Sequence, residues 1–224
     1  MDELKVIQIK EKVTAKNDEE AAAVRTILKS HKTYLVNLMS SPGAGKTTLL
    51  CHLIPLLTKR GLRVGVMEAD IDGECDAETI MEKTKAKAIQ IHTGGACHLT
   101  AQMTKEGLEN LSLDDFDIVF LENIGNLVCP AEFDTGANTK LVLLSVPEGD
   151  DKPLKYPLMF EVADLVCVTK IDTLPAFDFD KDKLIANVHK RNPDAKVLFL
   201  SSKKDQNIDL VAGYLFERVT SFIR

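Results

Sequence analysis

The chain has few aromatic residues and no tryptophan, and it has no block of basic residues. Its formal net charge of −6 argues against nucleic acid as the main partner. No apolar run approaches the roughly 20 residues that a membrane-spanning helix needs, and the charged start, residues 1–5, lacks the apolar region of a signal peptide. We therefore expect a cytoplasmic protein that contacts neither nucleic acid nor membrane.

The five cysteines include no Cys-x-x-Cys pair. In a reducing compartment they are thiols, and some of them can serve as metal ligands. A length of 224 residues with an ordinary apolar fraction accommodates one domain, or one domain with an extension.

The most informative segment spans residues 40–48, Ser-Ser-Pro-Gly-Ala-Gly-Lys-Thr-Thr. It follows an apolar run at residues 34–39 and precedes a helical pattern at residues 49–57. A strand, a glycine-rich loop and a helix in this order form the context of a P-loop. The usual pattern opens with Gly, where this chain has Ser40. We prefer the P-loop to a simple serine-glycine turn because Gly-Lys-Thr occurs in this context.

The residues of this loop suit a phosphate chain. Gly43 and Gly45 let the backbone curl and point successive N–H groups inward, and the following helix adds its positive dipole end. Lys46 would reach the β- and γ-phosphates, and the Thr47 hydroxyl would bind Mg²⁺. The predicted phosphate-binding set is Gly43, Ala44, Gly45, Lys46, Thr47 and Thr48.

Short apolar runs alternate with helical segments along the rest of the chain, which indicates a parallel sheet buried on both faces. We predict an α/β fold: a P-loop NTPase three-layer sandwich with a mostly parallel sheet, and ligands beyond the carboxyl ends of the strands. After the first strand, the expected strands are residues 63–68, 88–91, 116–121, 140–146, 165–169 and 196–200. The expected helices are residues 75–83, 97–108, 160–163, 181–190 and 207–223.

Residues 1–32 precede this core and are expected to form an N-terminal helical extension. Asn17 and Glu20 resemble a capping box that opens a helix ending near Lys29. Residues 33–224 then form the nucleotide-binding domain with its metal site.

Acidic residues follow two of the expected strands. Glu122 and Gly125 resemble a Walker B and switch II segment, in which the acid holds Mg²⁺ and the glycine N–H contacts the γ-phosphate. Asp70, Asp72 and Asp76 follow residues 63–68, where a switch I carboxylate could bind Mg²⁺ or orient the attacking water. The alternative is a solvated acidic turn, with Asp76 near a helix N-terminus. The predicted catalytic residues are Lys46, Asp70, Asp76 and Glu122, and the predicted Mg²⁺ ligands are Thr47, Asp70, Asp76 and Glu122.

The segment Thr-Lys-Ile-Asp at residues 169–172 predicts guanine as the base, because it resembles the Asn-Lys-x-Asp motif of GTPases. The Asp172 carboxylate can accept both guanine donors, and the Lys170 stem can lie over the base. Thr169 replaces an asparagine that normally ties this strand to the P-loop, so we expect that tie to be missing. The second base-contacting loop is expected at Ser201, Ser202 and Lys203.

A second group of residues suits a metal ion. Cys97 and His98 follow the strand at residues 88–91, and Cys129 follows Gly125. Both loops leave carboxyl ends of the same sheet, so they can meet, and two thiolates with an imidazole suit Zn²⁺ or Ni²⁺. A helix starting at Cys97 would lower the pKa of that thiol. From spacing alone, buried structural thiols are an equal alternative, and they are our interpretation of Cys51, Cys75 and Cys167.

Three segments, residues 40–50, 89–99 and 121–134, resemble the hydrogenase nickel-incorporation (HypB) family. The resemblance extends from about Thr33 to the C-terminus. It implies a GTPase of the SIMIBI class that dimerises with nucleotide and delivers nickel during [NiFe]-hydrogenase maturation. The implied partners are other nickel-insertion accessory proteins and the hydrogenase large subunit. It also implies that Cys97, His98 and Cys129 are metal ligands at the dimer interface, and that Asp70 and Asp76 are switch I acids.

Two features depart from that family. Residues 1–32 contain no cysteine and a single histidine, His31, whereas some members carry a Cys-rich or His-rich nickel site there. The lysine that many relatives of this class have early in the P-loop would fall at Ser41. Neither N-terminal nickel storage nor activation across subunits through that lysine is therefore expected.

Three other functions were weighed. A urease accessory GTPase shares the fold, but its Cys-Pro-His motif is not matched, because Ala131 follows Pro130. A nucleotide-dependent scaffold with structural cysteines would not require the acidic switch residues. An ATP-dependent kinase would not require Asp172. Because Gly125 and Cys129 are four residues apart, we also expect nucleotide binding to alter metal affinity.

Overall fold

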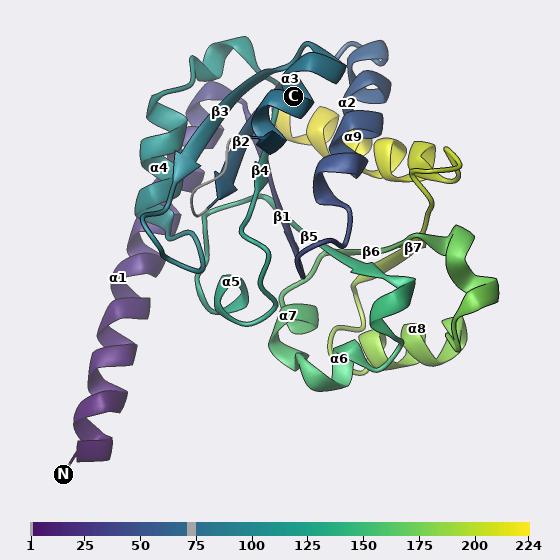
Figure 1. Ribbon diagram of the computed structural model, residues 1–224. Coiled ribbons are helices and arrows are strands. Elements are labelled where there is room, and N and C mark those ends of the chain that lie inside the picture. Colours follow the sequence, from purple (N-terminus) through teal and green to yellow (C-terminus); the bar gives the residue numbers. More distant parts are fainter. Residues whose placement is uncertain (1, 71–74) are drawn as a thin grey trace.

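The computed structural model describes the backbone of residues 2–70 and 75–224, and the side chains of this range from residue 14 onward except that of residue 75. Within this part of the chain, seven strands form one sheet in the order β3-β2-β4-β1-β5-β6-β7 (Figure 1). Every neighbouring pair is parallel, which confirms the predicted fold class. The strands are β1 (Tyr34–Ser40), β2 (Val64–Asp70), β3 (Lys87–His92), β4 (Ile118–Glu122), β5 (Thr139–Ser145), β6 (Leu165–Thr169) and β7 (Lys196–Phe199).

Helices cover both faces of the sheet and give the expected three layers (Figure 1). They are α1 (Asp2–His31), α2 (Lys46–Lys59), α3 (Cys75–Thr84), α4 (Ala101–Glu109), α5 (Cys129–Glu132), α6 (Lys152–Lys155), α7 (Pro157–Glu161), α8 (Lys181–His189) and α9 (Ile208–Ile223). Three 3₁₀ turns complete the elements: η1 (Leu113–Asp115), η2 (Val146–Glu148) and η3 (Ile171–Ala176). None of the helices in the described residues is long and apolar enough to cross a membrane.

Alternation along the strands determines which helices each face contacts. Val36 and Leu38 of β1 belong to the core under α2, α3 and α9. Leu35 packs on the other face with residues of α1 and α4, while the β5 and β6 residues of that face pack under α7 and α8. Both faces are therefore buried, as the continuous apolar strands predict.

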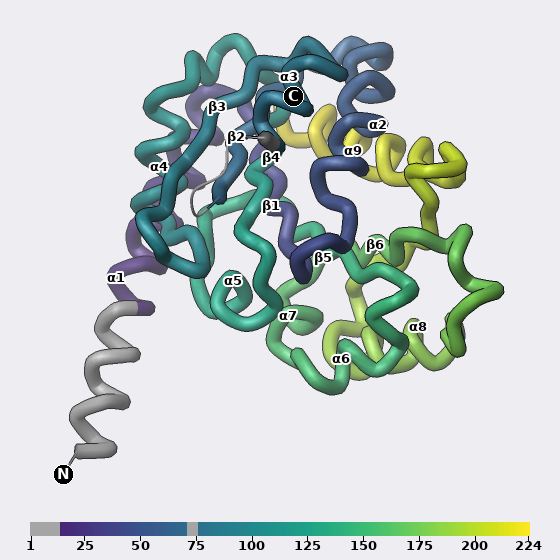
Figure 2. Tube along the Cα trace, viewed as in Figure 1, coloured from purple at the N-terminus to yellow at the C-terminus, as the bar shows by residue number. Residues whose placement is uncertain are grey.

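The helix near the N-terminus differs from its prediction. It runs without a break from Asp2 to His31, so Asn17 lies inside it and does not cap it. Val24 and Leu28 of this helix are fully buried in the core, and the trace shows α1 lying beside α4 (Figure 2). The capping-box prediction was wrong because the Asn17 amide bonds to groups of other elements, which local sequence does not reveal.

Two other helix boundaries also differ. The segment expected to be helical from residue 97 begins at Ala101, because Thr100 is the N-cap and its side chain accepts a hydrogen bond from Met103 N–H at 3.2 Å. Cys97 and His98 therefore lie in the preceding loop. Around residues 160–163, the helix is α7, which ends at Glu161.

Candidate functional site

The P-loop has the backbone that its sequence predicts. Gly43 and Gly45 take positive φ angles of 73° and 101°, a region that L side chains rarely adopt. Gly45 is the N-cap of α2, so Lys46 and Thr47 occupy its first turn. Ser40, which stands where the usual pattern has glycine, has a hydrogen-bond partner. The Lys46 ammonium donates to Ser40 Oγ at 3.3 Å. Ser40 thus contacts the lysine expected to bind phosphate.

Thr47 and Glu122 meet at the end of β4. Thr47 Oγ1 donates to Glu122 Oε1 at 2.8 Å. Glu122 is 2% exposed, and among the described residues its Oε2 has no hydrogen-bond partner. Burial raises the pKa of Glu122 to about 7, although Lys46 and the Thr47 hydrogen bond oppose this change. A buried carboxylate oxygen without a partner, beside a P-loop hydroxyl, fits an Mg²⁺ ion, which prefers hard oxygen ligands.

Two of the predicted switch I acids act on the same carboxylate. Asp70 ends β2 and is half-buried, and Asp76 is exposed in the first turn of α3. The negative charge of each raises the pKa of Glu122 and therefore acts at the predicted Mg²⁺ position. Asp72 lies outside the described residues.

Glu68 is a neighbour of this cluster that the sequence analysis missed. It is 4% exposed in β2 and lies in register with Glu122 on β4. Burial raises the pKa of Glu68 to about 7, and the negative charge of Glu122 adds to this rise. The available signal was a glutamate inside an otherwise apolar strand, where an ionisable side chain is rarely placed without a partner.

A pocket of about 260 Å³ lies beside the P-loop, where the base was predicted to bind. Asp172 faces it, and Asp172 Oδ1 accepts a hydrogen bond from Ser201 Oγ at 2.6 Å. This bond lowers the pKa of Asp172, which favours the charged acceptor that guanine requires. Ser201 itself is fully buried and does not line the pocket. The lining residues are Ala44, Gly45, Thr48, Thr169, Lys170, Asp172, Thr173, Ser202 and Lys203.

Two side chains tie the base loop to the P-loop. Thr169 Oγ1 donates to the Ala44 carbonyl at 2.7 Å, and Lys170 Nζ donates to the Gly43 carbonyl at 2.7 Å. The expectation that Thr169 would lack the tie to the P-loop was therefore wrong. The threonine side chain is shorter than that of asparagine. Thr169 is nevertheless buried against the P-loop, so its hydroxyl reaches a backbone carbonyl.

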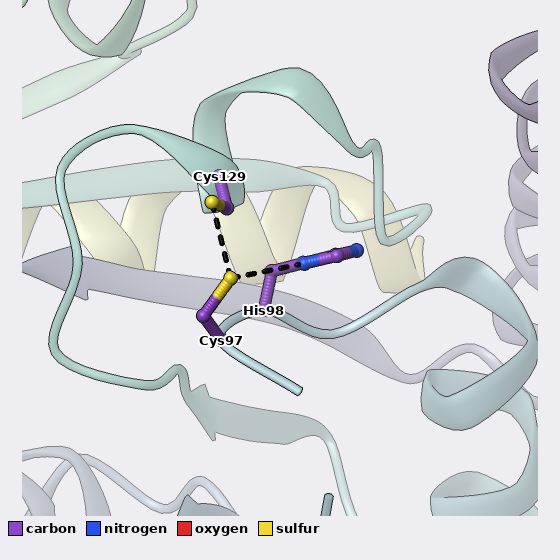
Figure 3. Close-up of side chains that lie close together, drawn as sticks. All are labelled: Cys97, His98 and Cys129. Atoms are coloured by element: carbon purple, nitrogen blue, oxygen red, sulfur yellow. Dashed lines mark hydrogen bonds between the residues drawn. The ribbon is translucent and has the colours of Figure 1, made fainter. Parts of the chain in front are cut away.

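Cys97, His98 and Cys129 come together at the end of the sheet (Figure 3). Cys97 Sγ lies 3.1 Å from Cys129 Sγ and 3.7 Å from His98 Nδ1. One ligand atom from each residue lies within 4.8 Å of the others. Two sulfurs and an imidazole nitrogen in this arrangement form a donor set for a borderline divalent ion such as Ni²⁺ or Zn²⁺.

The surroundings of these side chains modify their protonation. The hydrogen bond with Cys129, with some burial, raises the pKa of the Cys97 thiol. The predicted lowering was wrong, because Cys97 lies in the loop and not at a helix N-terminus. Burial lowers the pKa of His98, with Glu132 opposing the change. The His98 ring stacks on Phe133 with ring centroids 4.0 Å apart, which holds the imidazole in place. The lowered pKa favours the neutral imidazole, which is the form that binds a metal.

The remaining described thiols lie away from this group. Cys167 is fully buried in β6, as expected of a small apolar side chain. Cys51 of α2 is partly exposed and packs against the core. Cys75 begins α3, and its side chain lies outside the described set.

Gly125 connects the two sites. It follows Glu122 on the loop that leads to Cys129, and it lies directly against Pro42 of the P-loop. The nucleotide and metal groups are therefore neighbours at the carboxyl edge of one sheet, as expected from the topology.

Comparison with known proteins supports this arrangement. The family described as CobW/HypB/UreG, nucleotide-binding domain, matches residues 34–199. A hydrogenase maturation factor HypB of Azotobacter chroococcum is 44% identical over 204 residues, which cover 91% of this chain and 66% of that protein. A hydrogenase/urease maturation factor HypB of Helicobacter pylori is 39% identical over 218 residues, which cover 96% of this chain and 88% of that protein.

A solved structure gives the same result. The crystal structure of HypB from Helicobacter pylori in complex with nickel is 38% identical and superposes with a TM-score of 0.87, covering 93% of this chain and 97% of that one. This chain belongs to the CobW/HypB/UreG nucleotide-binding family and, within it, to the HypB hydrogenase maturation factors.

Proposed function

We propose that this protein is a GTP-hydrolysing metallochaperone of the cytoplasm that delivers nickel during [NiFe]-hydrogenase maturation. The observation that carries the proposal is the group Cys97, His98 and Cys129, whose ligand atoms lie within 4.8 Å of one another. This group lies on loops that leave the same sheet edge as a P-loop and a guanine-type pocket.

The nucleotide is GTP. Asp172 accepts the N1–H and amino donors of guanine, which adenine cannot offer in that arrangement. Lys46 binds the β- and γ-phosphates together with the N–H groups of the loop that contains Gly43 and Gly45. The Gly125 N–H contacts the γ-phosphate, and Ser202 and Lys203 close the base pocket. Asp172 in its charged form is the residue that makes the site selective.

Thr47 and Glu122 would hold Mg²⁺ in the nucleotide complex, and Asp70 and Asp76, whose charges act on Glu122, would bind the ion or its water. The ion supplies charge neutralisation at the phosphates. Asp70 or Asp76 orients the attacking water, and Lys46 stabilises the negative charge that develops on the phosphate oxygens.

The nickel ion is cargo. Cys97 and Cys129 bind it as thiolates and His98 as a neutral imidazole, so binding releases protons. Three protein ligands leave coordination positions open, which suits transfer to another protein better than permanent binding. The same donors accept Zn²⁺, so the ligand set alone does not select nickel over zinc.

The two activities are coupled through dimerisation. GTP orders the loop that contains Gly125 and thereby moves Cys129, so that the half-sites of two subunits pair in a homodimer or separate. The acceptors are other nickel-insertion accessory proteins and the hydrogenase large subunit. Delivery to urease is a second candidate, because the Helicobacter pylori relative is a hydrogenase/urease maturation factor.

Nickel binding and nucleotide preference test the proposal. The wild-type protein is expected to bind nickel, and Cys97→Ser and Cys129→Ala are expected to lose that binding. Cys51→Ser, a partly exposed thiol away from the group, serves as the matched control. The protein should hydrolyse GTP in preference to ATP. Equal nickel binding by all four proteins, or equal use of ATP, would contradict the proposed function.

A further inference from the structure

We infer that Asn17 of α1 is a positioning residue for the nickel site: it sets the spacing between the two loops that carry the metal ligands. The inference deepens the proposed function and rests on it. Asn17 lies far from the ligands in sequence and does not touch the metal-binding atoms. Its side chain bonds to both loops at once.

The two hydrogen bonds have complementary directions. Asn17 Oδ1 accepts from the Ala101 N–H at 2.9 Å, and Asn17 Nδ2 donates to the Asp134 carbonyl at 2.8 Å. Ala101 is the first residue of α4, three residues after His98. Asp134 lies five residues after Cys129 and follows α5. A single amide therefore connects the end of one ligand loop to the end of the other.

The connection is shielded from water, since Asn17 is 4% exposed. Bonds to backbone groups in such a place are not readily replaced by water, and removal of the amide leaves the buried Ala101 N–H and the partly buried Asp134 carbonyl unpaired. The helix dipole and the first free N–H groups of α4 reinforce the acceptor bond, because Oδ1 caps the start of that helix.

α1 also fixes the far end of this connection. The Arg25 guanidinium pairs with the Asp134 carboxylate, and Asp134 Oδ1 accepts from the Gly136 N–H at 3.0 Å. Gly136 has φ +80° and lies so close to Val24 that a Cβ there would be 2.6 Å from the Val24 Cβ. The segment after α5 is thus held on the surface of α1. The Asp134 carbonyl that bonds to Asn17 is therefore fixed relative to α1.

Two further contacts connect the two ligand loops. Asn126 Nδ2 donates to the Cys97 carbonyl at 3.3 Å, and His98 stacks on Phe133 with ring centroids 4.0 Å apart. Phe133 immediately precedes Asp134, so a shift of Asp134 carries the stacking partner of His98 with it. A metal site needs its ligands held within about 0.5 Å of the binding geometry, and Asn17 supplies the buried constraint on that spacing.

The experiment compares Asn17→Ala and Asn17→Asp with Asp18→Ala, an exposed neighbour on the same helix. Asn17→Asp keeps the acceptor for Ala101 N–H but replaces the donor to Asp134 by a repelling carboxylate. Each protein is measured for nickel affinity by competition with a chelator, for the nickel–thiolate charge-transfer absorption, and for GDP affinity. Cys129→Ala is included as the ligand variant.

We expect both Asn17 variants to bind nickel about tenfold more weakly, which corresponds to the loss of one or two buried hydrogen bonds. Their charge-transfer band should change in position or intensity. GDP affinity should stay within twofold of wild type, and Asp18→Ala should match wild type throughout.

Three results would overturn the inference. Wild-type nickel affinity and absorption in both Asn17 variants would show that the amide does not set the spacing. A loss confined to Asn17→Ala would make Asn17 only a cap of α4. An equal loss of GDP affinity would show an effect on the whole fold. Nickel binding that also survives Cys129→Ala would instead contradict the proposed function, so the two failures are distinguishable.

Discussion

Gly125 lies against Pro42 with no room for a side chain: a Cβ on Gly125 would be 2.9 Å from Pro42 Cγ and 3.0 Å from Pro42 Cα. Pro42 belongs to the P-loop, and Gly125 is four residues before Cys129. The loop that carries a predicted metal ligand therefore touches the loop that would hold the phosphates. Packed contacts of this kind shift between discrete arrangements and do not deform freely, which gives a direct route from nucleotide to metal.

The first prediction concerns this contact. Gly125→Ala places a methyl group inside van der Waals distance of the Pro42 backbone, so one of the two loops must move. We expect GTP affinity to fall and the free energy of unfolding to fall by about 1–3 kcal/mol, as in other overpacked positions. Titration with a GTP analogue and urea denaturation measure the two effects.

Gly213→Ala is the control, because its Cβ would lie 3.6 Å from Arg60 Nη1 in a helix that favours alanine. Equal behaviour of both variants would contradict the close packing.

Base selection gives the second prediction. Asp172→Asn replaces an acceptor of two hydrogen bonds with a group that also donates, so the match to guanine is lost and xanthine becomes the better base. GTP affinity should fall roughly 10- to 100-fold, since hydrogen bonds to a charged group are removed, while xanthosine triphosphate should bind more tightly than it does to the wild type. Isothermal titration with both nucleotides measures the exchange. Asp178→Asn, at an exposed position, is the control and should leave both affinities unchanged. Unchanged nucleotide selectivity in Asp172→Asn would show that Asp172 does not bind the base.

The third prediction concerns Glu122 and Mg²⁺. Glu122→Gln keeps the acceptor for the Thr47 hydroxyl but removes the negative charge. We expect Mg²⁺-dependent GTP hydrolysis to fall about 100-fold, the size of effect seen when one charge-stabilising group is lost. GDP binding without Mg²⁺ should be retained, because the base pocket and P-loop are intact. Hydrolysis rates measured over a Mg²⁺ titration would reveal the loss. Full activity of Glu122→Gln at the Mg²⁺ concentration that the wild type needs would show that Glu122 does not bind the ion.

The fourth prediction concerns pH and Asp134. Burial acts to raise the pKa of this carboxyl, but hydrogen bonds from Arg25 and Gly136 and the charge of Lys140 outweigh it and lower the pKa. A lowered pKa means that the charged form stabilises the fold above the unfolded value, about 3.9, and that this contribution is lost as the pH falls through the lower folded-state pKa. Asp134→Asn should therefore be less stable than wild type by about 1 kcal/mol at pH 7.

The difference between wild type and Asp134→Asn should narrow as the pH falls below about 4, where the carboxyl of the unfolded chain becomes neutral, and should be lost below the lower folded-state pKa. Urea denaturation between pH 2.5 and 7 gives the two stability curves. Asp18→Asn should follow wild type, because Asp18 is exposed. A stability difference that stays constant over this pH range would mean that the Asp134 charge has no part in it.

Much of the site follows from local sequence. The P-loop was predictable because glycine conformations and the helix start are properties of consecutive residues, and Gly43 and Gly45 have the expected positive φ angles. The parallel sheet followed from continuous apolar strands, because only a sheet buried on both faces accommodates them. That topology also predicted that Cys97 and Cys129 would meet, which the 3.1 Å between their sulfurs shows.

Three of the failures share a physical cause: each depends on a partner distant in the sequence. Asn17 matched a local capping pattern, but its amide bonds to residues more than 80 positions away. Thr169 was expected to lack the tie because it has no side-chain amide, although its hydroxyl reaches a carbonyl of the P-loop. Glu68 was passed over because only the sheet register places it beside Glu122.

The central claim is that nucleotide controls the nickel site. The most direct measurement is the nickel affinity of the full chain in GDP and in a non-hydrolysable GTP analogue, with oligomeric state recorded in the same samples and Cys129→Ala as the control. We predict at least a tenfold difference in nickel affinity between the two nucleotides, a matching change in oligomeric state, and no specific nickel binding in Cys129→Ala. By thermodynamic reciprocity, nickel should also change the preference between the two nucleotides by the same factor. Equal nickel affinity with GDP and with the GTP analogue would contradict the account.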